Sequence, residues 1–428
     1  MNKEKPFKIS KQAVYKAYKK VKANRGSCGV DRESIKAFEV NLKNNLYKIW
    51  NRMSSGSYWP PPVLEVEIPK KGGVRRLGIP TVSDRIAQMV VKQYLEPELE
   101  PEFLDDSYGY RPNKSALEAV GKARERCWRY DWAIDLDIKG YFDNIDHELL
   151  MKAVRKHTEC RWILLYIERW LKAPVKKVNG ELESRNRGTC QGSVISPLMA
   201  NLFLHYAFDK WMKRNHPQIP FERYADDILA HSRTETEAKE IKEKIERRLK
   251  ECQLELNLAK TRIVYCKDDR RKGRHENEKF TFLGYEYRPR KVKMKGKRSF
   301  AGFNPGVSKE AKAEMTQKMR KWKLHLRSHE TLERLAKEIN PVVRGWINYY
   351  SKYYRTALRP VLIHLNEILV RWVKRKYKRF RGRFKRAINW LGKIAKSSPN
   401  LFAHWAHNCR PAAGSQEPHE SRGLRGDL

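Results

Sequence analysis

The chain is poor in cysteine and has no long apolar run, and these absences exclude several classes of protein. Its 428 residues include seven cysteines, an odd number with no CxxC pair among them. A disulfide-stapled secreted fold is therefore not expected. No run of about 18 apolar residues occurs, so no membrane span is expected. The N-terminus also lacks the apolar centre of a secretory signal. We therefore expect a protein of a reducing compartment, the cytoplasm.

Acidic residues are also scarce, which leaves the chain strongly basic. It contains 91 lysines and arginines against 50 acidic residues, a formal net charge of +41. A surplus of this size predicts a polyanionic partner, and nucleic acid is the strongest candidate. Residues 288–396 hold 32 basic and 6 acidic residues, so this quarter of the chain carries more than half of the net charge. We expect it to form a separate polyanion-binding region.

Metal-binding cysteine and histidine motifs are almost absent. The nearest approach is the group His404, His407 and Cys409 near the C-terminus. No second ligand pair accompanies it, so a zinc site is not favoured there.

Two adjacent carboxylates stand out in the run FERYADDILAHS. Tyr224-Ala225-Asp226-Asp227 lies between a short segment and the apolar residues 228–230, a pattern that predicts strand, tight turn and strand. Most Asp-Asp pairs are solvated turns, and the pairs at 105–106 and 268–269 have loop-like surroundings. Like charges side by side repel, so a fold that keeps them commonly supplies a cation such as Mg²⁺.

A further carboxylate upstream gives the pair a specific interpretation. Apolar residues alternate with Asp135 and Asp137 in WAIDLDI, which predicts a half-buried strand with both acids on one face and Asp137 at its end. An acid at a strand end together with an acid pair on a hairpin is the arrangement by which palm-type polymerases bind two metal ions.

The remaining pattern predicts an α+β region followed by helices. We expect helices within residues 10–55, a hairpin over 63–79 that turns at Gly72-Gly73, and a helix capped by Thr81 or Ser83. Short strands are predicted at 254–258, 261–265 and 280–287. Beyond Arg290 we predict only helices, at 309–326, 331–339, 345–356, 361–380 and 384–395, separated at Pro341, Pro360 and Gly382.

Seven motifs in a fixed order carry a family resemblance. They are IPKKGGVRRLGIPTVSDRIAQ, SYGYRPNKSALEAV, DIKGYFDNIDH, GTCQGSVISPLMANLFL, YADD, LNLAKT and FLGY. Together they resemble the reverse transcriptases encoded in group II introns, and INPVVRGWINYYSKYY resembles the maturase domain of that family. The likeness extends over residues 10–400. It implies a right-hand polymerase with fingers, a palm built on an antiparallel sheet, and an all-helical thumb and maturase domain.

The resemblance also implies a division of the chain. Residues 1–56 would extend the fingers, 57–287 would form fingers and palm, 288–400 the thumb and RNA-binding maturase region, and 401–428 a basic and polar tail. Many relatives end in an endonuclease with paired CxxC motifs, which are missing here. We therefore expect a short bacterial class without that domain.

The resemblance assigns roles to single residues in the polymerase region. Asp137, Asp226 and Asp227, with the backbone of Ile138, would bind two Mg²⁺ ions, for which Mn²⁺ is a possible substitute. Lys70 and Arg75 would hold the incoming triphosphate, although Lys71 and Arg76 are competing assignments. Phe142 would exclude a 2′-hydroxyl, Gln191 and Gly192 would lie under the nascent base pair, and Lys260 would protonate the leaving pyrophosphate. Without the family, Phe142 is a core residue, Lys70 and Arg75 belong to a solvated hairpin, and Lys260 is a surface lysine.

Two further groups of residues are assigned to nucleic acid. The primer grip would be Phe282, Leu283, Gly284 and Tyr285. Contacts to RNA are expected from Arg344, Trp346, Tyr350, Arg371, Lys374, Arg375, Arg379 and Arg381, although about half of the aromatic residues in this region should pack in a core.

The implied function is RNA-directed DNA synthesis combined with assistance to splicing and retrohoming. The expected partners are a group II intron RNA, an RNA template with a DNA primer, dNTPs and target DNA. Two alternatives stay open: a maturase that binds RNA without polymerising, and a related reverse transcriptase used in phage defence or diversity generation.

Overall fold

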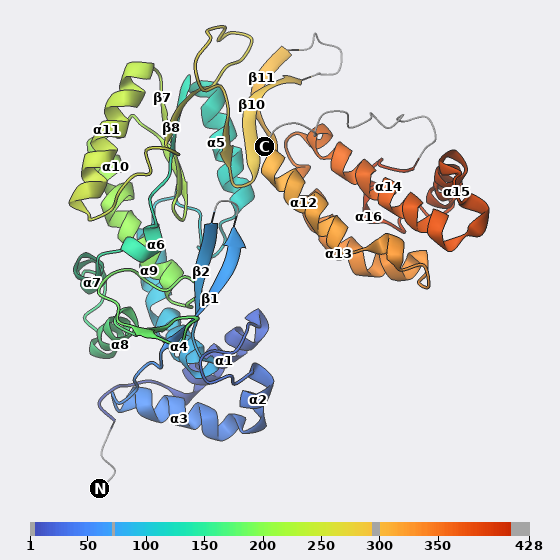
Figure 1. Cartoon of the computed structure of the whole chain (residues 1–428). Coiled ribbons are helices and arrows are strands. Elements are labelled where there is room, and N and C mark those ends of the chain that lie inside the picture. The colour runs from blue at the N-terminus through green and yellow to red at the C-terminus, as the bar shows by residue number, and fades with distance from the viewer. Residues whose placement is uncertain (1–4, 71–72, 293–299, 412–428) are drawn as a thin grey trace. The chain divides into compact units, whose positions relative to one another are not determined.

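The computed structural model describes residues 5–70, 73–292 and 300–411, and the chain forms two compact units (Figure 1). The first unit is Met1–Tyr265 and the second is Cys266–Leu428. Each unit has its own apolar core. Within the described residues, no helix is both long and apolar enough to cross a membrane.

The first unit begins with helices that start at polar caps, and the predicted cap Thr81 is one of them. Ser10, Ser34 and Thr81 each accept a backbone hydrogen bond at the start of a helix. Figure 1 shows α1, α2 and α3 gathered at one end of this unit, with α1 packed on α4. The helices are α1 (Lys11–Asn24), α2 (Ile35–Val40), α3 (Leu42–Ser54) and α4 (Val82–Leu99).

The predicted basic hairpin is present and forms part of a small sheet. Strand β1 (Val63–Lys70) pairs antiparallel with β2 (Gly73–Ile79), and β4 (Val175–Lys176) and β5 (Leu182–Glu183) extend it in the order β2-β1-β4-β5. Of the predicted Gly72-Gly73 turn, Gly72 lies outside the described residues, as does Lys71.

A second antiparallel sheet, with strand order β6-β7-β3-β8, carries the acidic motifs. Its strands are β3 (Trp132–Leu136), β6 (Phe221–Tyr224), β7 (Asp227–Ser232) and β8 (Arg262–Tyr265). Helices α5 and α11 contact this sheet. The remaining helices of the unit are η1 (Glu100–Glu102), α5 (Ala116–Arg129), α6 (Tyr141–Asn144), α7 (His147–Arg155), α8 (Arg161–Leu171), α9 (Ser196–Leu204), α10 (Lys210–Asn215) and α11 (Glu235–Glu251). A π-helical turn, η2 (His205–Asp209), joins α9 to α10.

One predicted strand of this unit is wrong. Residues 254–258 form a loop that makes a single bridge, between Leu256 and Ile138. Leu254 and Leu256 are buried, which explains the strand-like alternation. The loop is folded to hold the end of β3, because Lys139 N–H donates to the Glu255 carbonyl at 2.8 Å.

The second unit opens with a three-stranded antiparallel sheet and continues as helices. The strands are β9 (Phe280–Phe282), β10 (Tyr285–Val292) and β11 (Phe300–Val307). The helices are α12 (Lys309–Lys321), η3 (Leu324–Leu326), α13 (Leu332–Tyr350), η4 (Arg355–Ala357), α14 (Arg359–Lys376), η5 (Lys378–Phe380), α15 (Phe384–Ser397) and α16 (Ala403–Ala406).

Three sequence predictions fail in this unit. The single strand expected over 280–287 is two strands, β9 and β10, joined by a turn at Leu283 and Gly284. Strand β11 was not expected, yet it pairs with β10 over eight residues. The predicted break at Pro341 is also wrong, because Pro341 lies inside the continuous helix α13. Its ring is on the exposed face of that helix. The α+β class with a helical C-terminal region is confirmed.

Candidate active site

The acid pair lies on a two-residue hairpin turn, as predicted. Tyr224 pairs with Asp227 across strands β6 and β7, so Ala225 and Asp226 form the turn between them. Ala225 adopts φ 58°, a left-handed conformation that is costly for a residue with a Cβ. Asp227 is exposed and Asp226 is partly buried.

Strand pairing brings Asp137 to the same end of the sheet. Leu136 at the end of β3 pairs with Ile228 in β7. One step further in this antiparallel register, Asp137 faces Asp227. The Asp137 N–H donates to Thr261 Oγ1 at 3.2 Å, and its carbonyl accepts from Asn257 N–H at 2.8 Å. The backbone around Asp137 is therefore fixed from the loop that follows α11.

The pKa of Asp135 reflects the negative charge at this end of the sheet. Burial raises the pKa of Asp135, and the charges of Asp227 and Asp137 raise it further, to about 7. Asp227 and Asp137 therefore both act on the partly buried carboxyl group of Asp135. Among the described residues, no group of three or more His, Cys, Asp or Glu side chains is arranged to hold a metal ion. The donor set itself is hard carboxylate oxygen with an excess of negative charge, which fits Mg²⁺.

Lys260 lies beside this acidic group. Its ammonium nitrogen is 3.6 Å from Asp137 Oδ2, and its side chain is 62% exposed. The structure thus places the predicted residue Lys260 next to Asp137. Ile138, whose backbone was predicted as a further ligand, is buried and bridges to Leu256.

The loop with Gln191 and Gly192 is attached to the basic hairpin. The Arg75 guanidinium donates through Nε to Gln191 Oε1 at 3.0 Å, and Gly78 N–H donates to the Gln191 carbonyl at 2.7 Å. Gly192 has φ +114°, and a Cβ there would lie 2.6 Å from the Gly78 carbonyl oxygen. Only glycine allows this approach. The predicted residues Arg75, Gln191 and Gly192 are therefore neighbours.

The other side of the same loop is attached to the segment that carries Phe142. Thr189 N–H donates to the Phe142 carbonyl, and Gly188 N–H donates to the Ile145 carbonyl, both at 2.7 Å. Phe142 is 7% exposed, and its ring meets that of Tyr141 at a centroid distance of 5.5 Å. Its side chain is thus packed as the core alternative predicts, and its role toward a sugar stays a prediction.

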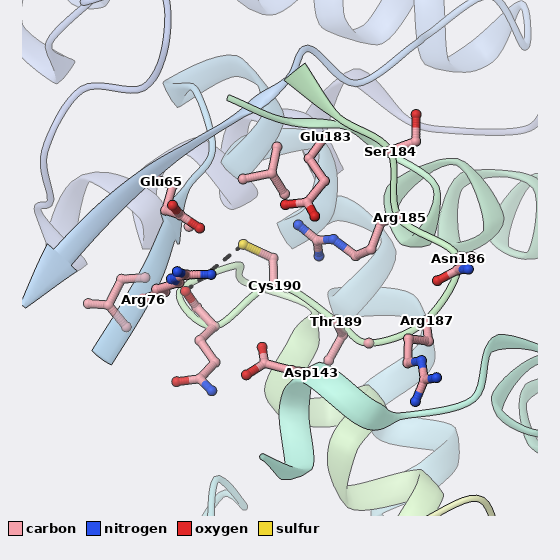
Figure 2. Close-up of a pocket in the computed structure, with 15 residues that line it drawn as sticks. Glu65, Arg76, Asp143, Glu183, Ser184, Arg185, Asn186, Arg187, Thr189 and Cys190 are labelled. Carbon is pink, nitrogen blue, oxygen red and sulfur yellow. Dashed lines mark hydrogen bonds between the residues drawn. The ribbon is translucent and has the colours of Figure 1, made fainter. Parts of the chain in front are cut away.

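A pocket of about 340 Å³ opens between this loop, β2 and the Asp143 segment (Figure 2). Basic side chains Arg76, Arg185 and Arg187 and acidic side chains Glu65, Glu183 and Asp143 line it. Arg75 instead bonds to Gln191, so the two competing arginines have different surroundings. Sequence reasoning missed Arg185 and Arg187, although two arginines directly before the Gly188-Thr189 bend were a visible signal.

Lys70 is the last residue of β1 and pairs with Gly73 in the hairpin. The competing Lys71 lies outside the described residues. The choice between these two lysines therefore stays a prediction.

In the second unit, the predicted primer grip is a tight turn between β9 and β10. Phe282 pairs with Tyr285, and the two residues between them, Leu283 and Gly284, have φ 50° and 78°. Two successive left-handed residues are typical of a hairpin turn that follows the strand twist. The Tyr349 hydroxyl donates to the Leu283 carbonyl at 2.8 Å. Burial raises the pKa of Tyr285, which donates to the Tyr349 carbonyl.

The predicted RNA-binding residues divide into packed and exposed groups. Trp346 is partly buried and stacks on Trp322 at 5.7 Å, and Tyr350 is partly buried against Tyr285 at 5.3 Å. Lys374 is partly buried. The exposed members are Arg344, Arg371, Arg375, Arg379 and Arg381.

His404, one member of the histidine group near the C-terminus, packs in the interior of the second unit. His404 is fully buried, with Nε2 2.7 Å from Asn366 Oδ1, and burial lowers its pKa to about 3. No metal-binding cluster includes it among the residues that the structure describes.

Two family models match the chain. "Reverse transcriptase (RNA-dependent DNA polymerase)" matches residues 68–287, about half of the chain, and "Group II intron, maturase-specific domain" matches residues 312–390.

The chain is also similar to individual proteins. The chain is 31% identical over 300 residues to protein YkfC of Escherichia coli, a match that covers 60% of this chain and 74% of YkfC. It is 34% identical over 195 residues to the group II intron-encoded protein LtrA of Lactococcus lactis, covering 45% of this chain but only 32% of LtrA. A solved telomerase structure from Candida albicans aligns with TM-score 0.46 and 12% identity over 86% of this chain and 70% of the telomerase chain.

The reverse transcriptase model spans the acidic sheet, the basic hairpin and the loop between them, and the maturase model lies in the second unit. Reverse transcriptases use divalent metal ions, and the maturase domain implies binding of intron RNA. The chain belongs to the group II intron reverse transcriptase and maturase family.

Proposed function

We propose that this chain extends a DNA primer on an RNA template by two-metal nucleotidyl transfer, with Asp137, Asp226 and Asp227 as the metal ligands. The observation that carries the proposal is the strand register that places Asp137 opposite Asp227 at one end of the sheet. Burial raises the pKa of nearby Asp135, and the charges of Asp227 and Asp137 raise it further. A site of such negative charge is suited to cations and not to an anionic substrate alone.

The side chains of the site have separable tasks in this reaction. Bound Mg²⁺ would activate the primer 3′-hydroxyl and neutralise the charge of the leaving pyrophosphate. Asp137 and Asp227 hold carboxylates at the ends of neighbouring strands, and Asp226 adds one from the turn. Lys260 is 3.6 Å from Asp137, so its ammonium group is close enough to donate a proton to a leaving group bound at these acids.

Nucleotide selection is assigned to the basic hairpin and the loop attached to it. The guanidinium of Arg75 and the ammonium of Lys70 suit triphosphate oxygens. Gln191 and Gly192 offer a backbone surface for the nascent base pair. Since Thr189 N–H donates to the Phe142 carbonyl, the same loop would help to position Phe142 relative to the sugar of a bound nucleotide.

The second unit is proposed to bind intron RNA and thereby to assist splicing and retrohoming. This proposal is supported by the exposed arginines of α13, α14 and the segment that follows α14. They lie within residues 288–396, which carry a net charge of +26. Exposed guanidinium groups neutralise phosphates and stack on unpaired bases. Target DNA is a further expected partner.

The test of the polymerase proposal is primer extension by Asp226→Ala. Wild-type chain should incorporate dNTPs on an RNA template with a DNA primer in Mg²⁺, and the variant should lose at least a thousandfold in rate. Asp105→Ala is the matched control, because Asp105 also belongs to an Asp-Asp pair but its side chain is fully exposed. Equal extension by Asp226→Ala and wild type would refute the metal assignment.

A binding-only maturase gives a different result in the same experiment. Such a protein would promote splicing of its intron RNA while the wild-type chain incorporated no dNTP. Efficient incorporation of ribonucleotides by wild type would instead favour a related enzyme with another use.

A further inference from the structure

Arg223, which lies two residues before Ala225 of the acidic turn, is completely buried and uses all of its hydrogen-bond donors. It lies on β6 with a relative exposure of 0%. Its five N–H groups have five acceptors. Asp209 accepts two of these bonds, from Nε to Oδ1 at 2.8 Å and from Nη2 to Oδ2 at 2.6 Å, and Ser107 Oγ accepts a further one from Nη2 at 2.8 Å. Nη1 donates to Asn201 Oδ1 and to the Ala225 carbonyl, both at 3.0 Å. The last of these contacts joins the guanidinium to the turn itself.

The π-helical turn η2 places the partner carboxylate. Asp209 is the last residue of η2, is fully buried, and forms a two-pronged ion pair with Arg223. Burial alone would raise the pKa of Asp209, but the charge and hydrogen bonds of Arg223 bring it below its ordinary value. Asp209 is therefore a fixed anion that orients the guanidinium.

The turn is confined from a second direction as well. A Cβ at Gly109 would lie 2.3 Å from Ala225 N, so the two backbones are in close contact. The Asn201 side-chain amide donates to the Gly109 carbonyl at 2.6 Å while its oxygen accepts from Arg223. Asn201 thus links the Arg223 group to the backbone that covers Ala225.

Ala225 needs such support. Its φ of 58° is unfavourable for a residue other than glycine, and a peptide with this conformation persists only when its surroundings impose it. The carbonyl of Ala225 belongs to the peptide group that precedes Asp226. A hydrogen bond that fixes this carbonyl also fixes the direction in which the next two side chains leave the backbone.

We propose that Arg223, oriented by Asp209, is a positioning residue that locks the left-handed turn and thereby aims the carboxylates of Asp226 and Asp227 at the metal site. This inference rests on the proposed function of those two acids. The competing explanation is that Arg223 and Asp209 only stabilise the interior. The two explanations differ in what happens to the turn when folding is preserved.

The decisive variant removes both charges together. Loss of Arg223 alone would leave Asp209 buried and unpaired, which commonly prevents folding, whereas replacing a buried ion pair by apolar residues is often neutral. Arg223→Met/Asp209→Leu should therefore fold, without the hydrogen bond to Ala225. The matched control is Arg126→Met, because the Arg126 guanidinium also binds a buried acid and the same strand, at Glu222 and the Phe221 carbonyl, but does not touch the turn. This control should fold, because Glu222 keeps His231 Nε2 as a partner at 2.6 Å.

Three measurements on the full chain separate the explanations. They are hydrogen exchange of residues 222–229, Mn²⁺ affinity without nucleic acid, and affinity for a primer–template duplex. A hydrogen bond from a charged donor changes an equilibrium by about tenfold to a hundredfold. We expect exchange in the turn to rise and Mn²⁺ affinity to fall by at least about tenfold in the double variant, with duplex affinity within twofold of wild type. Arg126→Met should keep both turn exchange and Mn²⁺ affinity.

Restoring backbone freedom provides a second check. Adding Ala225→Gly to the double variant should recover part of the Mn²⁺ affinity, because glycine adopts the left-handed conformation without strain. Unchanged turn exchange or unchanged Mn²⁺ affinity in a folded double variant would overturn the inference. Asp227→Asn is measured in parallel. If this variant binds Mn²⁺ as tightly as wild type, the proposed metal site is refuted. The hydrogen exchange of the turn in the double variant would still test the positioning role of Arg223.

Discussion

The close contact between Gly192 and Gly78 gives a sharp prediction for Gly192→Ala. Gly192 has φ +114°, and an added Cβ would lie 2.6 Å from the Gly78 carbonyl oxygen. The loop must therefore move away from β2. That movement breaks the 2.7 Å hydrogen bond from Gly78 N–H to the Gln191 carbonyl and pulls Gln191 from Arg75.

The size of the effect follows from two separate costs. Holding alanine in this backbone region costs about 1–3 kcal/mol, and the lost hydrogen bond adds about 1 kcal/mol. A total of about 2 kcal/mol, at the lower end, corresponds to roughly a 30-fold change in an equilibrium constant. If the loop must return to its native position to accept a nucleotide, the KM for dNTPs should rise by this factor.

The assay is steady-state primer extension at varied dNTP concentration, with Gly180→Ala as control. Gly180 also has a positive φ, +88°, but a Cβ there meets no atom within 4 Å. The control therefore carries similar backbone strain in the β4–β5 turn without disturbing the loop, and its KM should stay within twofold of wild type. An unchanged KM in a folded Gly192→Ala variant would show that this loop does not form the nucleotide site.

Three other predictions concern selectivity, stability and RNA binding. Phe142→Ala should raise the rate of ribonucleotide relative to deoxyribonucleotide incorporation at least tenfold in single-nucleotide extension, and unchanged discrimination would leave Phe142 as a core residue only. Burial raises the pKa of Asp84 from 3.8 to about 6, so the folded state binds this proton more tightly than the unfolded chain does. The free energy of unfolding should therefore fall by about 3 kcal/mol as the pH rises from 4 to 6. Asp84→Asn should remove that dependence in thermal melts between pH 4 and 7, and identical pH profiles would contradict the assignment. Replacing Arg371, Arg375 and Arg379 by alanine should lower the slope of log affinity for intron RNA against log salt by about 2, whereas replacing exposed Lys239, Arg247 and Lys250 of α11 should leave it unchanged.

The local pattern was enough to predict the acidic sheet. The alternation around Asp135 and Asp137 and the turn at Ala225-Asp226 are determined by neighbouring residues, so strands β3, β6 and β7 follow from sequence. The failures have tertiary causes. Leu254 and Leu256 are buried like strand residues, but their backbone turns aside to hold Asp137. Pro341 does not end α13, because residues on both sides of it, such as Ile339 and Val343, are buried in the core and hold the helix continuous.

The missed elements of the site depend on distant partners. An arginine in a short strand is usually exposed, and nothing near Arg223 in sequence reveals Asp209, which lies 14 residues earlier on another element. In the same way, the contact between Gly78 and Gly192 joins segments more than 100 residues apart. Only the folded chain shows that these glycines allow two backbones to meet.

The π-helical turn between α9 and α10 also has a consequence for how this family can vary. A π turn contains one residue more than the regular α-helix around it. A turn that closes its hydrogen bond over five residues instead of four absorbs the additional residue within about one helical turn, so α10 keeps its phase relative to α9. Deleting one residue between His205 and Asp209 would therefore restore a regular α-helix and leave Met212 directed into the core. The cost of such a deletion should fall on the contacts of the segment itself, above all on the ion pair of Asp209 with Arg223.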